Sequence, residues 1–156
     1  MIPVQHIHPM IVHFPIVLLL LVAVFEIVAT LMGRDVTGRT ATGNLAVGAI
    51  VLAALAAIAA FYFGDIALSF AEDHGFESDV AEIHEGLGRT LAIAAALWAV
   101  VRGGLWLRNI KLTGPLAYAM PVVSIAGALL VVWTAYYGGQ LVFDLGVNVA
   151  SKAAGA

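Results

Sequence analysis

The sequence contains no cysteine and very few charged residues. The lack of cysteine excludes disulfides, thiolate metal sites, c-type haem attachment and cysteine-ligated iron–sulfur clusters within this chain. Only 11% of the 156 residues are charged and 62% are hydrophobic, whereas about 25% of the residues in a soluble domain are charged. Because a surface with so few charges would aggregate in water, the composition predicts an integral membrane protein.

Further absences exclude other classes of function. The basic residues form no stripe, so we expect no nucleic-acid partner. The glycine-rich stretch "GRDVTGRTATG" lacks the Gly-Lys-Ser/Thr of a phosphate-binding loop, and no nucleophile–base pair is evident. We therefore predict that the chain is not an enzyme on its own. The first basic residue is Arg34, so the N-terminal apolar run is predicted to be a membrane span and not a signal peptide.

Four segments are long and apolar enough to cross a bilayer, which takes about 20 residues. They cover residues of about 10–32, 45–64, 87–107 and 116–137. The pattern predicts an all-α, four-helix membrane bundle that forms a single domain over residues 1–156. The last span is predicted to end at Gly138 and Gly139. Arg89 and Arg102 lie near the ends of the third span, where their long side chains are expected to reach the headgroups.

The basic residues indicate the orientation of this bundle. Most of them lie in the predicted loops 33–44 and 108–115, namely Arg34, Arg39, Arg108 and Lys111. The positive-inside rule places these loops in the cytoplasm, which leaves both termini and the acidic 65–83 loop outside (N-out/C-out), in the periplasm or at the cell exterior. In that loop, "IALSF" is expected to lie flat along the interface. Glu26 lies inside the first span, and we expect it to be neutral or paired with Arg34 or Arg102.

All five histidines fall on the predicted outer side, namely His6, His8, His13, His74 and His84. Pro9 suits the first position of a helix, because proline lacks a donor that would be unsatisfied there. Pro15 is expected to bend this helix just below His13. His84 precedes the third span on a helix that leads into the membrane. The sequence therefore predicts that His13 and His84 lie at similar depth, just inside the outer interface.

Four interpretations of these histidines remain open. His13 and His84 could ligate a haem iron from both faces, with His8 and Asp65 orienting the imidazoles. Copper or zinc could bind to His8, Met10, His13 and His84, since imidazole and thioether suit copper. The imidazoles could carry protons, or they could simply make hydrogen bonds at helix ends. We favour haem, because ionisable residues inside a membrane are usually functional. Small residues in the second and third spans would leave room for a flat apolar plate, although close helix packing accounts for most of them.

Four stretches of the sequence resemble one family. They are "HPMIVHFPIVLLLLVAVFE" at 8–26, "FGD" at 63–65, "HEGLG" at 84–88 and "YYGGQLVFDLGVNV" at 136–149. Together they resemble, in order and over nearly the whole chain, the bacterial membrane proteins called domain of unknown function 2231. The resemblance implies a four-helix domain of the inner membrane in a redox setting, since relatives are joined to Rieske-type or cytochrome c-type modules. The positions of this sequence that match the motifs of the family are His8, His13, Asp65, His84, Gly138 and Gly139.

These observations lead to one preferred function and two alternatives. The preferred function is a b-type haem-binding electron-transfer module of the bacterial inner membrane, with its histidines at the periplasmic face. Its partners would be the lipid bilayer and a redox partner such as quinol, and a homo-oligomer is compatible with the sequence. The alternatives are a periplasm-facing copper- or zinc-binding membrane protein and a non-catalytic structural subunit of a membrane redox complex.

Overall fold

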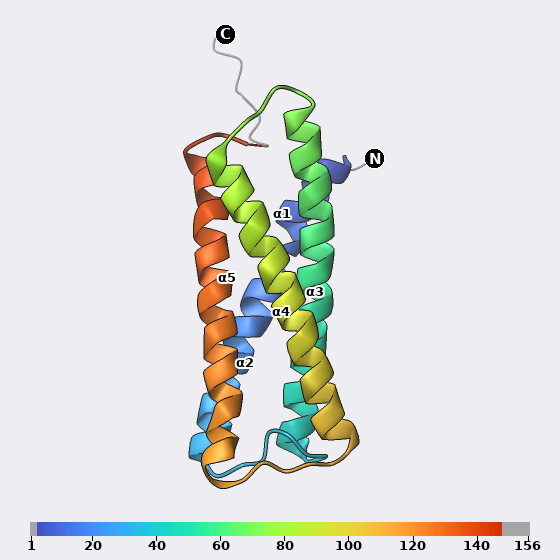
Figure 1. Ribbon diagram of the computed structural model, residues 1–156, viewed down its shortest axis with the longest axis vertical. Coiled ribbons are helices and arrows are strands. Elements are labelled where there is room, and N and C mark those ends of the chain that lie inside the picture. The colour runs from blue at the N-terminus through green and yellow to red at the C-terminus, as the bar shows by residue number, and fades with distance from the viewer. Residues whose placement is uncertain (1–2, 148–156) are drawn as a thin grey trace.

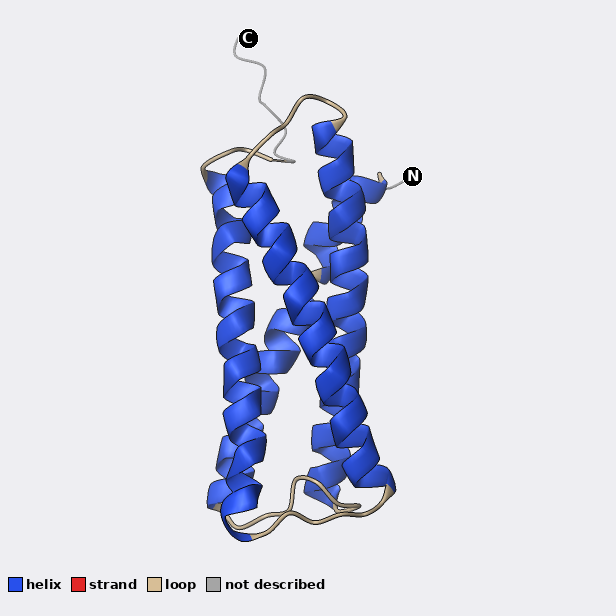
Figure 2. Cartoon of the chain, in the orientation of Figure 1, coloured by secondary structure: helices blue, strands red, loops and turns tan. Residues whose placement is uncertain are grey.

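The computed structural model describes residues 3–147 (Figure 1). In this part of the chain every regular element is a helix and there is no strand (Figure 2). The elements are η1 (Val4–His6), α1 (Ile7–Ile11), α2 (His13–Leu31), α3 (Ala41–Glu72), α4 (Asp79–Leu107), η2 (Gly114–Tyr118) and α5 (Ala119–Phe143). The predicted all-α fold is therefore confirmed.

The four long helices form a closed bundle. Each of α2, α3, α4 and α5 packs against its neighbours in the chain, and α5 also packs against α2. Both ends of the described chain lie at the same end of the bundle as the α3–α4 turn (Figure 1). This end contains the histidines, and we call it the histidine end. The connections α2–α3 and α4–α5 lie together at the opposite end (Figure 1).

The lengths and the apolar composition of the helices suit a membrane. Four helical stretches are long and apolar enough to cross one, namely Ile7–Leu31, Ala41–Glu72, Asp79–Leu107 and Gly114–Phe143. The outward faces of these stretches expose large apolar side chains such as Leu97, Val100 and Leu129. In water such a surface would be unfavourable, whereas lipid tails solvate it without cost. The four membrane spans predicted from hydropathy are thus confirmed.

At the histidine end α3 is longer than predicted, whereas α4 begins ahead of the third span and includes His84, as expected. Helix α3 continues to Glu72 and α4 begins at Asp79, so the predicted 65–83 loop shrinks to residues 73–78. The "IALSF" stretch therefore belongs to α3 and does not lie along the interface, because Ala67 in this stretch is buried and extends the packed face of the helix. Ser78 caps α4 by accepting a hydrogen bond from the Val80 N–H at 3.2 Å.

Helix α5 likewise passes through Gly138 and Gly139 and ends only at Phe143. The predicted end at these glycines is wrong. Both have ordinary helical backbone, since neither is among the glycines with positive φ, so neither acts as a left-handed helix stop. Position 138 has room only for glycine because the ring of His84 lies close to its backbone.

The first span is interrupted, as expected from Pro15. Proline has no N–H to donate to the carbonyl four residues earlier, which here is that of Ile11, the last residue of α1. The interruption falls at Val12, between α1 and α2, and so lies one residue before His13 and not below it. Helix α1 also begins at Ile7, two residues ahead of Pro9, so Pro9 is not the first helical residue.

The middle of the bundle is an apolar layer with one buried residue from each long helix. These residues are Leu19 of α2, Ala53 of α3, Leu91 of α4 and Val131 of α5. Ile16, Leu18 and Leu130 pack around this layer. It separates the histidine end from the polar groups nearer the opposite end.

Those polar groups form a buried ion pair, which corrects the expectation that Arg102 reaches the headgroups. Arg102 is 1% exposed and Glu26 is 0% exposed, and Nη1 of Arg102 donates to Oε1 of Glu26. Ser124 donates to the second carboxylate oxygen at 2.6 Å, and Nη2 of Arg102 donates to the carbonyl of Val36. A charge buried in apolar surroundings requires such partners, so Glu26 holds Arg102 inside the bundle.

Candidate functional site

A cavity of about 400 Å³ lies at the histidine end and is lined by residues of all five α-helices. This volume is in the range of pockets that hold a small molecule or a cofactor. Leu91 and Val131 of the central apolar layer line it, so the layer closes the cavity toward the opposite end of the bundle. Most of the wall is apolar. The polar side chains that line it are His8, His13, Asp65, His84, Glu85 and Thr134.

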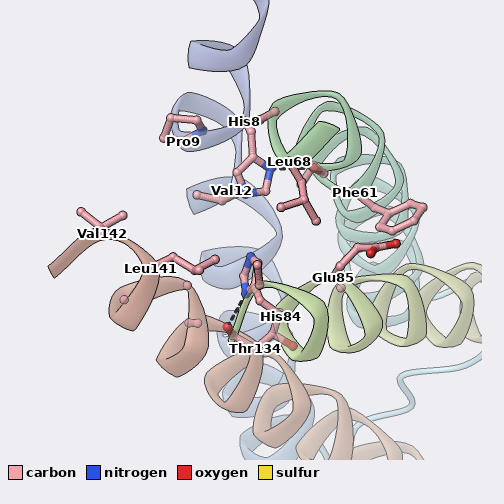
Figure 3. A pocket seen from close by; sticks show the side chains of 18 of the residues that line it. His8, Pro9, Val12, Phe61, Leu68, His84, Glu85, Thr134, Leu141 and Val142 are labelled. Atoms are coloured by element: carbon pink, nitrogen blue, oxygen red, sulfur yellow. Dashed lines mark hydrogen bonds between the residues drawn. The ribbon is translucent and has the colours of Figure 1, made fainter. Parts of the chain in front are cut away.

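Two histidines from different helices meet in this cavity. His8 extends from α1 and His84 from α4, and their rings point toward one another (Figure 3). The ring centroids are 6.1 Å apart and the ring planes are nearly perpendicular, at 82°. The structure therefore pairs His84 with His8, and the two imidazoles are neighbours although they are far apart in the sequence.

Main-chain carbonyls fix the orientation of both rings. Nδ1 of His8 donates to the carbonyl of Ala60 on α3 at 2.8 Å, and Nδ1 of His84 donates to the carbonyl of Thr134 on α5 at 3.0 Å (Figure 3). Because a carbonyl can only accept, each Nδ1 carries the hydrogen. In a neutral ring this leaves the lone pair of Nε2 available for a ligand. Metal-ligating histidines are commonly oriented by this kind of hydrogen bond.

A glycine makes room for each ring, four residues after the carbonyl that the ring contacts. A Cβ added at Gly64 would lie 2.9 Å from Cε1 and Nδ1 of His8, and one at Gly138 would lie 2.9 Å from Cε1 of His84. Cβ atoms do not approach other atoms so closely in real structures. The pairs Ala60–Gly64 and Thr134–Gly138 are thus two copies of one arrangement, in which the missing side chain lets an imidazole reach the helix backbone.

This arrangement predicts a specific effect of alanine at Gly138. The added methyl group would collide with the His84 ring, and overpacking of this kind typically costs about 1–3 kcal/mol. We expect Gly138→Ala to lower the free energy of unfolding by that amount, as measured by thermal unfolding in detergent. Gly139→Ala is the matched control, because nothing lies within 4 Å of its added Cβ. Equal stability of the two variants would contradict the proposed steric role.

The residues predicted from the sequence occupy different places in the cavity. His13 has an exposed side chain at the cavity edge, and the ring that faces His84 is that of His8. Asp65 also lines the cavity with an exposed side chain. The hydrogen bonds that orient the two rings come from the carbonyls of Ala60 and Thr134 and not from Asp65. Sequence reasoning missed these two residues and Gly64.

The other predicted ligands do not converge. Met10 is 57% exposed and is not among the residues that line the cavity. His74, which is not one of the predicted ligands, is exposed, and its Nδ1 donates to the carbonyl of Phe70 at 2.7 Å. Within residues 3–147 there is no group of three or more His, Asp or Glu side chains that could hold a metal ion. In this part of the chain the two imidazole rings that face each other in the cavity are those of His8 and His84.

The bundle, its apolar outer faces and this internal pocket define an integral membrane protein with four spanning helices. The chain belongs to the family of predicted membrane proteins called domain of unknown function 2231, whose sequence profile matches residues 5–151. A search of the curated proteins and a search of the solved structures found no match. The resemblance seen in the sequence motifs is therefore confirmed.

Proposed function

We propose that the cavity binds a b-type haem with His8 and His84 as its axial ligands. The protein would serve as an electron-transfer module of the bacterial inner membrane, between a membrane donor such as quinol and an acceptor outside. His8 thus takes the role that the sequence pattern suggested for His13. The observation that carries this proposal is the pair of facing imidazoles, each held through Nδ1 by a main-chain carbonyl.

The spacing of the rings supports a single metal ion between them. If two imidazoles bind one iron from opposite sides with metal–nitrogen bonds of about 2.0 Å, their centroids lie roughly 6 Å apart, since Nε2 is about 1 Å from the centroid. The observed separation is 6.1 Å.

The number of donors favours haem over a bare metal ion. A porphyrin supplies four nitrogen ligands to its iron, so the protein has to supply only the axial ones. Zinc instead takes three or four ligands from the protein. Two inward-facing imidazoles match the first requirement. Once bound, the iron would supply one-electron chemistry by cycling between its ferrous and ferric states.

The walls of the cavity also suit a flat apolar plate. Besides the two glycines that contact the rings, several lining residues carry little or no side chain, namely Ala57, Ala60, Ala81, Gly88, Ala135 and Gly139. Their small size leaves the space between the helices open, and it keeps the surroundings of the imidazoles apolar. The polarity of the surroundings is one of the features by which a protein tunes a haem.

The charge distribution supports a periplasmic location for this site. Arg34, Arg39, Arg108 and Lys111 lie in the connections at the end of the bundle opposite the histidines. By the positive-inside rule that end faces the cytoplasm. The cavity and both ends of the described chain would then face the periplasm, where an external electron acceptor could reach them.

An absorption spectrum tests the proposal. The protein is purified in detergent from cells supplied with ample haem, and spectra are recorded before and after addition of dithionite. We expect a sharp Soret band, with resolved α and β bands on reduction. A featureless visible spectrum would overturn the proposal.

A further inference from the structure

We infer that haem reaches the histidine pair sideways from the bilayer, through an opening between α1 and α5, and not from the aqueous phase above the bundle. This inference rests on the proposed function, because it concerns the route to the same cavity. The lateral opening is defined by residues Pro9, Val12, Leu141, Val142 and Phe143, which all line the cavity.

The packing of the helices creates this opening. Helix α1 packs against α3, whereas α5 packs against α2 and α4. Helices α1 and α5 therefore flank the cavity without packing closely on one another. Figure 3 shows Pro9, Val12, Leu141 and Val142 on the same side of the two imidazoles, with Pro9 and Val12 along the first span and Leu141 and Val142 along α5. The histidine pair thus lies behind a side window of the bundle.

The rim of the window has the chemistry of a lipid-facing surface. Pro9 is exposed, Val142 is 42% exposed and Phe143 is 88% exposed. All three belong to stretches that are long and apolar enough to cross a membrane. No polar side chain belongs to the five residues that define the opening, so a porphyrin dissolved in the bilayer meets apolar surface throughout its approach.

The aqueous side of the cavity has the opposite character. Asp65 and Glu85 line the cavity together with the apolar Phe76 of the α3–α4 turn, and Glu72 and Asp73 lie where α3 ends and this turn begins. Arg89 donates to Glu85, which leaves the carboxylates in excess. Haem carries two propionates, and like charges close together repel each other. Approach through this acidic mouth is therefore less favourable than approach through the apolar window.

Beside the window the first span lacks one helix hydrogen bond, although Val12 keeps helical dihedral angles (φ −58°, ψ −27°). Helix α1 has only five residues, from Ile7 to Ile11, and Pro15 cannot donate across the break to its last carbonyl. A short helix joined in this way can shift relative to α2 and widen the window. Since His8 lies on α1, the same shift would bring one axial ligand onto the iron after the plate has passed.

Haem uptake by the full-length protein in proteoliposomes tests the route. Haem-free protein is mixed with haem-loaded phosphatidylcholine vesicles, and growth of the Soret band is followed with time. We expect Val142→Trp, which narrows the window, to slow uptake by at least about tenfold, which is about 1.4 kcal/mol in the barrier, at an unchanged final amplitude. The matched control is Leu129→Trp on the same helix, which faces outward and is expected to keep the wild-type rate.

Two further variants keep the test decisive. Phe143→Ala widens the window and should speed uptake, which provides a result even if Val142→Trp does not fold. Asp65→Asn removes a charge from the aqueous mouth and should leave the rate unchanged. Faster uptake by Asp65→Asn, or equal rates for Val142→Trp and the wild type, would overturn the lateral route alone. If the wild type forms no Soret band, the haem proposal fails and the route fails with it.

Discussion

Replacing either His8 or His84 with alanine is expected to abolish the spectrum of six-coordinate, low-spin haem. Each variant removes one of the two imidazoles that face each other across the cavity at a centroid distance of 6.1 Å. No other histidine ring is paired with either of them in the described part of the chain, so the iron would become five-coordinate or the haem would be lost. Absorption spectra of the purified variants, scaled to protein concentration, measure the effect.

His13→Ala is the matched control for these variants. It removes an imidazole from the same N-terminal region, but one whose side chain is exposed at the cavity edge. We expect its spectrum to match that of the wild type. Loss of the low-spin spectrum in His13→Ala together with its retention in His8→Ala would contradict the assignment of His8 as a ligand.

Removal of one member of the buried ion pair is expected to cause the largest loss of stability in the bundle. Glu26 and Arg102 are both almost completely buried, so Glu26→Leu or Arg102→Leu leaves an uncompensated charge among apolar helices. Such changes typically cost about 3–5 kcal/mol. The expected result is poor accumulation in the membrane and an early unfolding transition in detergent.

The double variant Glu26→Leu/Arg102→Leu isolates the cause of this loss. Replacing both members of a buried pair by apolar residues is often neutral or even stabilising, so the double variant should be more stable than either single variant. Ser124→Ala removes one neutral donor to the carboxylate and should cost only about 1–3 kcal/mol. A double variant as unstable as the sum of the two single ones would contradict the pairing.

The spans could be predicted from the sequence because lipid imposes a length of apolar residues on every crossing helix. The residues at which the helices end could not be predicted in this way. Helix α3 continues past Gly64 and Asp65 as far as Glu72, although these residues are less apolar, because Ala67 still packs in the bundle. Polarity indicates where a helix leaves hydrocarbon, but buried contacts decide where the helix itself ends.

Whether His8 or His13 faces His84 depends on how the first helix is rotated about its axis, and the sequence does not determine this rotation. His8 and His13 are five positions apart, which in a regular helix turns their side chains roughly 140° away from each other. Only one of them can then point at His84. The interruption at Val12 lies between them, and the packing of α1 on α3 turns His8 inward. Burial depth alone had favoured His13, which lies deeper along the first span.

The residues that orient the two imidazole rings could not be predicted from the sequence for a different reason. Every residue has a carbonyl, so nothing in the sequence distinguishes those of Ala60 and Thr134 as the partners of His8 and His84. The available signal was the glycine that follows each of them four positions later, in "FGD" and in "YYGG". Such a signal becomes interpretable only when the neighbouring helix is known to bring an imidazole against it.

The ion pair was partly predictable. Glu26 lies inside an apolar run, and a charge there requires a partner, for which Arg34 and Arg102 were both open. The structure selects Arg102 because it lies on α4 at the level of Glu26 on α2, where Ser124 of α5 completes the shell of the carboxylate.

The central claim is that one haem iron lies between the imidazoles of His8 and His84. Low-temperature electron paramagnetic resonance of the oxidised wild-type protein tests it most directly, because the signal reports both the axial ligands and the angle between their planes. The rings are 82° apart, so we predict the strongly anisotropic low-spin ferric signal that perpendicular imidazole planes produce. A high-spin ferric signal, or the absence of any haem signal from protein made with ample haem, would contradict the claim.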